Sequence, residues 1–135
     1  MGSIKCQSLK DRLGPEESGQ IIPIDEFFDG NDDLGSIGCN LLPHPGVDAF
    51  RRVLTGLLGR PDVRAVYAQI SEFDPGEDCW PFTDTVLVAG TISVESLRGL
   101  VSSLQPDEVG LAGEFGDSPS ISERHGGPVL IIWWD

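Results

Sequence analysis

The chain has few positive charges and no long apolar run. Its 135 residues include 9 lysines and arginines against 22 aspartates and glutamates, which gives a formal net charge of −13. A field of that sign repels phosphate backbones and attracts cations, so we expect a basic protein partner and no nucleic acid. No apolar run approaches the roughly 20 residues of a membrane helix, so we expect no membrane partner either.

Cysteine is also scarce. Cys6, Cys39 and Cys79 are the only three cysteines, and no two of them form a CxxC pair. An odd, sparse set is typical of reduced thiols in the cytosol rather than of a disulfide framework. The first 20 residues lack the apolar segment of a secretory signal. The sequence therefore predicts a cytoplasmic protein, with residues 1–20 as a flexible polar tail before a single domain over residues 21–135.

The signatures of common enzymes are missing as well. The sequence contains no phosphate-binding loop ending in Lys-Ser/Thr, no dinucleotide fingerprint, no HExxH and no GxSxG. The two histidines, His44 and His125, are far apart in sequence, so a Cys–His dyad would need the fold to join its members. We assign no catalytic residue, cofactor or metal, although a small enzyme remains an alternative interpretation of the sequence.

Two segments show the spacing of amphipathic helices. Residues 46–58 place Val47, Phe50 and Leu54 on one stripe, and the pattern closes at Gly59 and Pro61. Residues 93–104 begin with a serine that can cap a helix, and their apolar residues recur at i, i+3, i+7 and i+10 before a proline. Residues 21–30 favour a short helical turn over a strand, because a proline suits a first helical turn and cannot donate to a sheet.

Four segments are predicted to be strands. Residues 36–41 alternate apolar and polar, residues 62–73 are rich in β-formers, residues 83–92 include a continuous apolar run, and residues 127–135 close the chain. The order indicates an α+β domain in which a mostly antiparallel sheet of about four strands carries two helices on one face, in the split βαβ (ferredoxin-like) arrangement. The long segment 106–127 suggests a functional loop, a mobile loop or a short element without a clear pattern.

The connection between the two middle strands combines acids with aromatic rings. An aromatic anchor rimmed by charge is typical of a binding hot spot, in which the ring fills a pocket of the partner and the acids select a basic surface. We expect the partner-binding residues to be Glu72, Asp74, Glu77, Asp78, Trp80, Phe82 and Asp84, with the acids of residues 25–33 as a further part of the surface. The alternative is that the rings fold back beneath the loop while the acids face water.

Residues 29–33 resemble the start of a calcium loop. Asp29, Asn31 and Asp33 place oxygen ligands on alternate residues, but Leu34 occupies the position of the required glycine and Asn40 that of the bidentate glutamate. An Asx-rich turn is therefore favoured over a cation site.

Three stretches, PIDEFFDGNDDLGSIGCN, WPFTDTV and the closing WWD, resemble a group of small uncharacterised bacterial proteins. The chain as a whole is similar to immunity proteins of bacterial toxin systems, which are short, acidic, cytosolic α+β domains that neutralise a toxin. This resemblance implies a non-catalytic interaction domain. Two alternatives stay open: a small hydrolase-like enzyme with a pocket at Asp29, Asp33, Cys39 and His44, and a homo-oligomeric structural domain, for instance a homodimer.

Overall fold

A computed structural model describes residues 21–29, 31, 36–38, 41, 44–72, 82–111 and 128–134, with only the backbone described at residues 71 and 72. Within these residues one antiparallel sheet has the strand order β1-β2-β3-β5-β4. Its strands are β1 (Ile21–Pro23), β2 (Val63–Glu72), β3 (Phe82–Gly90), β4 (Glu108–Leu111) and β5 (Val129–Trp133). The helices are α2 (Ile24–Phe28), α3 (Val47–Gly56) and α4 (Val94–Val101), and the 3₁₀ turns η2 (Leu57–Gly59) and η3 (Ser102–Leu104) extend α3 and α4.

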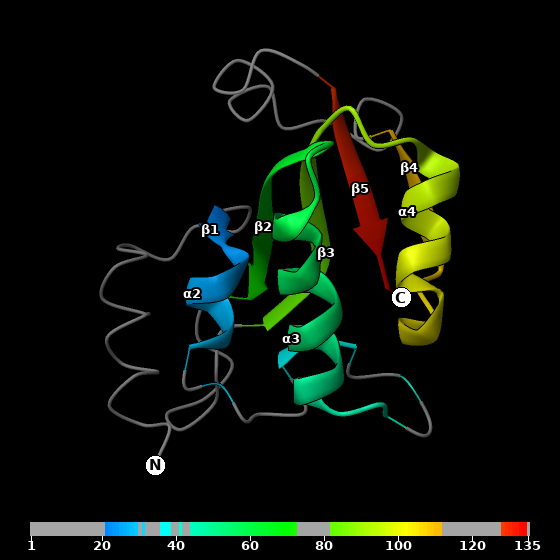
Figure 1. Cartoon of the computed structure of the whole chain (residues 1–135). Helices are drawn as coiled ribbons and strands as arrows, with labels where there is room; N and C mark the ends of the chain where they lie inside the picture. Colours follow the sequence, from blue (N-terminus) through cyan, green and yellow to red (C-terminus); the bar gives the residue numbers. More distant parts are fainter. Residues whose placement is uncertain are drawn as a thin grey trace.

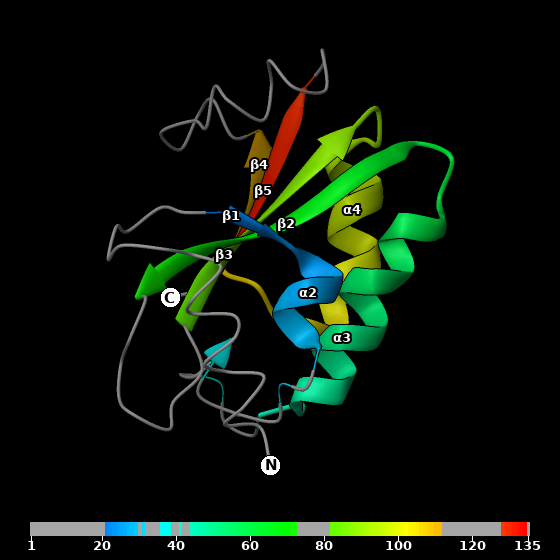
Figure 2. The same cartoon turned by 90° about the vertical axis from the view of Figure 1, so that its left-hand side faces the viewer.

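The three helices cover one face of the sheet (Figures 1 and 2). This arrangement confirms the predicted α+β class with a mostly antiparallel sheet. In the part of the chain that is described, no helix is long and apolar enough to cross a bilayer.

Helices α3 and α4 form where the apolar spacing predicts them. The stripe of α3 buries Val47, Phe50 and Leu54 against the sheet. Helix α4 begins where the Ser93 hydroxyl accepts a hydrogen bond of 3.1 Å from the backbone N–H of Ser96, which satisfies one of the unpaired donors of the first turn. The sequence signals for both helices are therefore confirmed.

Both faces of the central strands bury apolar side chains. Along β5, Leu130 and Ile132 pack in the core beneath the helices, whereas Val129 and Ile131 belong to a second cluster with Leu87. Successive side chains of a strand point to opposite faces, so these two clusters lie on opposite sides of the sheet. Burial on both faces explains the continuous apolar run of β3.

The segment 21–30 contains both a strand and a helix. Helix α2 begins at Ile24, so Pro23 is not in its first turn. Pro23 is instead the last residue of β1. The preference for a helical turn was therefore right for residues 24–28 and wrong for residues 21–23. A proline fits here because β1, within the described sheet, is an edge strand that pairs with β2 alone, and it needs no hydrogen bond on its outer side.

The strand predicted at residues 36–41 is absent from the residues described there. Ile37 makes one isolated parallel bridge to Thr83. Gly38 then adopts φ of 64°, and the Leu41 N–H bonds to the Gly38 carbonyl in a turn. The alternating pattern fails because the glycine reverses the chain before a ladder can form.

The segment 106–127 contains a fifth strand. Strand β4 pairs with β5 from Glu108–Trp133 to Leu111–Leu130 and forms the far edge of the sheet. The observed strand number and order therefore differ from the predicted four-stranded ferredoxin-like arrangement. A strand of four residues containing a glycine gives too short a pattern to be recognised from sequence.

Candidate partner-binding site

The predicted partner-binding connection leaves the sheet at the end of its two longest strands. β2 and β3 pair as far as Glu72 and Phe82, whereas β1 reaches only Gln69 and β5 reaches only Thr85. The end of the β2–β3 hairpin therefore projects past its neighbouring strands, β1 and β5. Its pairing shifts register twice between Gln69 and Glu72. Such bulges bend a strand locally and are common next to functional sites.

The start of β3 is fixed by hydrogen bonds. The Thr83 hydroxyl lies 2.6 Å from the Gln69 carbonyl and also accepts the Thr85 N–H. The Asp84 carboxylate accepts a hydrogen bond of 2.8 Å from the Thr85 hydroxyl, while its carbonyl accepts the Trp134 N–H at 2.9 Å. The chain is therefore held firmly at the base of the connection.

The structure describes three of the seven residues predicted to bind the partner. Phe82 and Asp84 are both half-buried and lie two residues apart on β3, so they share one face of the strand. Glu72 is described only as the last backbone position of β2. Asp74, Glu77, Asp78 and Trp80 lie outside the described residues.

A second acidic surface lies between α2 and α3. A pocket of about 390 Å³ is lined by Asp25, Glu26, Phe28, Asp29, Arg51 and Thr55. Helix α2 buries Ile24, Phe27 and Phe28, so its acidic residues are left on the outer side. The amphipathic turn thereby places three carboxylates around one concave surface.

Negative charge outweighs positive charge in this pocket. Among the described residues that line it, Arg51 is the single basic one. Its guanidinium already pairs with Asp48, one turn earlier on α3. The pocket therefore offers a net negative surface suited to a basic group.

His44 has a structural role in the loop before α3. The Gly46 N–H donates to Nδ1 at 2.8 Å, so Nδ1 is the acceptor and Nε2 carries the proton. Nε2 then donates to the Ile37 carbonyl at 2.8 Å. With both nitrogens engaged by backbone, the ring is not placed to act as a general base. Of its predicted neighbours in an enzyme pocket, Asp29 is exposed, and Asp33 and Cys39 lie outside the described residues.

The calcium-like stretch has the contacts of a turn where it is described. Asn31 is buried, and its side-chain amide donates to the Ser36 hydroxyl at 2.9 Å. Its backbone N–H bonds to the Phe28 carbonyl. In the described ranges no group of three or more His, Cys, Asp or Glu side chains could hold a metal ion. Asp33, the third predicted ligand, is outside those ranges.

Sequence comparison places the chain among bacterial relatives. It is 30% identical over 123 residues to "Uncharacterized protein YfbO" of Escherichia coli (strain K12), an alignment that covers 90% of this chain and 86% of the relative. No solved structure matches it. Residues 4–127 match the profile described as "Uncharacterized protein YfbO family". This chain therefore belongs to the YfbO family.

Proposed function

We propose that the protein is a non-catalytic interaction domain that binds a basic protein partner. The observation that carries this proposal is the concave surface between α2 and α3, where Asp25, Glu26 and Asp29 line a pocket of about 390 Å³. A lysine or arginine side chain of the partner enters this pocket with its charge near the carboxylates and its aliphatic stem toward Phe28. The net charge of −13 steers a basic partner toward the molecule.

The connection between β2 and β3 forms the other part of the proposed surface. The C-terminal end of α2 and the last residues of β2 point toward the same end of the molecule (Figure 1). One partner can therefore contact both regions. In this proposal the acids Glu72, Asp74, Glu77, Asp78 and Asp84 select the partner, and Trp80 with Phe82 supplies the apolar anchor.

In its more specific form, the proposal is an immunity-type protein that acts in the cytoplasm. An acidic inhibitor can block a nuclease because its carboxylates occupy the positions of the substrate phosphates. The support is the similarity of this acidic chain to immunity proteins, together with its strong negative charge. The enzyme alternative gains no comparable support from the described residues, where both ring nitrogens of His44 are engaged.

The test compares charge variants of two acidic surfaces. One variant replaces the pocket acids (Asp25→Asn, Glu26→Gln, Asp29→Asn), and a matched control replaces three exposed acids elsewhere (Glu95→Gln, Asp107→Asn, Glu108→Gln). Both change the net charge equally. Each protein is immobilised, exposed to lysate of the source bacterium, and eluted with salt, and the retained proteins are identified by mass spectrometry. Affinities for the recovered partner are then measured by calorimetry.

The expected result is one basic protein that wild type and the control retain and the pocket variant loses. Loss of one charge-assisted contact weakens binding by roughly tenfold or more. A third variant with amides at Glu72, Asp74, Glu77 and Asp78 measures the contribution of the β2–β3 connection. Equal weakening by the pocket variant and the control would reduce the effect to overall charge, and that outcome would reject the pocket as a specific site.

A further inference from the structure

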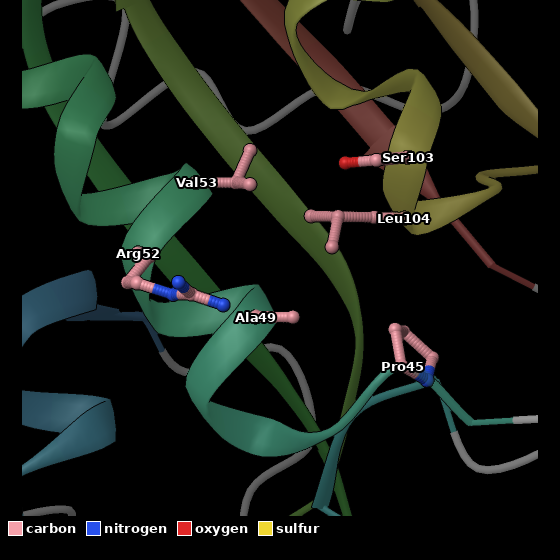
Figure 3. A pocket seen from close by; sticks show the side chains of 6 residues that line it. All are labelled: Pro45, Ala49, Arg52, Val53, Ser103 and Leu104. Atoms are coloured by element: carbon pink, nitrogen blue, oxygen red, sulfur yellow. The ribbon is translucent and has the colours of Figure 1, made fainter.

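A second concave surface lies on the other side of α3. It has a volume of about 430 Å³ and is lined by Pro45, Ala49, Arg52, Val53, Ser103 and Leu104 (Figure 3). Leu104 is fully buried, and Ala49 and Val53 are half-buried, so these apolar side chains form the floor. Arg52 and Ser103 are exposed and lie at the rim. We call this surface the Arg52 groove.

The charge of the Arg52 groove is opposite to that of the acidic pocket. Arg51 and Arg52 are neighbours on α3, but the carboxylate of Asp48 pairs with Arg51. Among the described residues, Arg52 hydrogen-bonds only to the Asp48 carbonyl, through Nε at 3.4 Å. In the described part of the chain no carboxylate lines the groove. The two Nη groups of Arg52 therefore remain available to a ligand that lies on the apolar floor.

The dimensions of the groove favour a small ligand over a peptide helix. Its floor along α3 runs from Ala49 to Val53, four residues apart, which is about 6 Å at 1.5 Å per residue. A helix bound in a groove is rigid and presents anchors at i and i+7, which are about 10 Å apart, so it would extend past this floor, whereas a flexible acyl chain can fold over it. The volume of about 430 Å³ lies within the usual range for small-molecule sites.

We propose that the Arg52 groove binds a small monocarboxylate with an apolar body, of the chemical class of a medium-chain fatty acid. The two Nη groups of Arg52 donate to the two carboxylate oxygens, while Ser103 lies across the groove on η3 (Figure 3). The apolar body covers Ala49, Val53 and Leu104. A single guanidinium matches a single negative charge, whereas the excess of acids on this chain disfavours a dianion such as a phosphate monoester.

The test titrates the full-length protein with decanoate. Binding is followed by calorimetry and by the indole N–H resonance of Trp134, which reports on the site because this N–H donates to the carbonyl of Leu104 on the floor. Arg52→Gln is expected to weaken decanoate binding at least tenfold. Ala49→Leu fills the groove and is expected to block binding. Circular dichroism verifies that each variant is folded.

Matched controls separate this site from general electrostatics. Arg51→Gln removes the neighbouring charge outside the groove and should leave decanoate affinity within about twofold of wild type. Decanol, which lacks the carboxylate, should bind wild type and Arg52→Gln equally. The acidic-pocket variant should bind decanoate normally, since this inference does not depend on the proposed function.

Three outcomes would overturn the proposal. These are no saturable decanoate binding, equal weakening by Arg51→Gln and Arg52→Gln, or a Trp134 shift unchanged by Ala49→Leu. An acidic peptide that binds through Arg52 where decanoate does not would assign the groove to a protein partner instead, and would equally reject the small-molecule site.

Discussion

The indole N–H of Trp134 donates a hydrogen bond of 2.9 Å to the carbonyl oxygen of Leu104. Both residues are buried, and the indole ring packs edge-on against Phe50 with ring centroids 5.5 Å apart. Leu104 is the last residue of η3, and Phe50 lies on α3. One side chain just beyond β5 therefore joins the first turn of α3 and the last residue of η3 to the sheet.

Trp134→Phe tests this connection. The variant keeps a ring but removes the N–H, which leaves the buried Leu104 carbonyl without that donor. We expect a loss of about 1–3 kcal/mol in the free energy of unfolding, measured by urea denaturation. Trp133→Phe is the matched control, because Trp133 is half-buried and points to the opposite face of the sheet. Equal effects of the two variants would contradict the role assigned to the hydrogen bond.

Gly90 ends β3 in a conformation that other residues rarely adopt. Its φ is 155°, and an added Cβ would lie 2.3 Å from the Asp62 carbonyl oxygen. That carbonyl accepts the N–H groups of Thr91 and Ile92, so it cannot move without breaking the turn into α4.

Gly90→Ala is expected to destabilise the fold by about 1–3 kcal/mol or more, as judged by the midpoint of thermal or urea unfolding. Gly99→Ala serves as the control, because an added Cβ there meets nothing within 4 Å and alanine favours a helix. A mild effect at Gly90 would show that the turn can rearrange.

The fold was predictable where periodicity was long. Helix α3 shows its buried stripe at Val47, Phe50 and Leu54 over about two turns, β2 is rich in β-formers, and β3 includes a continuous apolar run. The alternating pattern at residues 36–41 was misleading because Gly38 turns the chain. Strand β4 was missed because it has only four residues, one of them a glycine, and it is defined by its long-range pairing with β5. Local pattern carries no information on such pairing.

The candidate site was predictable only in its chemistry. An excess of acids in residues 25–33 predicts a negative surface, but the pocket arises because α2 and α3 pack side by side, which the sequence does not specify. The Arg52 groove was missed for the same reason. Arg51 and Arg52 are adjacent in the sequence and have the same charge. The structure distinguishes them because the Asp48 carboxylate pairs with Arg51.

Arg60 and Asp62 form a two-point ion pair next to β2. Nε donates to Oδ1 at 2.9 Å and Nη2 to Oδ2 at 3.1 Å. The hydrogen bonds from Arg60 lower the pKa of the Asp62 carboxyl below its ordinary value of 3.8. Because the folded-state pKa is the lower one, the pair stabilises the fold above about pH 4, and this contribution is lost as the pH falls through the folded-state pKa.

Asp62→Asn should therefore lower stability at neutral pH, and its difference from wild type should shrink in acid. The effect is small, since the two side chains are 38% and 32% exposed and solvent screens the pair. Urea midpoints across the acidic range provide the measurement. Arg60→Gln and the double variant complete the cycle, in which additive single effects would show that the two groups do not interact.

Arg98 protects an edge of the sheet. It lies on α4, and its Nη2 donates to the Val109 carbonyl on edge strand β4 at 3.2 Å. The same strand carries Leu111, which is 44% exposed, so an uncovered edge would offer both backbone acceptors and an apolar contact to a second molecule.

Arg98→Ala is expected to increase concentration-dependent self-association relative to wild type in sedimentation velocity. Arg51→Ala removes an exposed arginine that pairs with Asp48 on its own helix rather than with a strand, and it should not increase self-association. If both variants sediment as wild type does, other parts of the chain protect the edge and Arg98 is dispensable there.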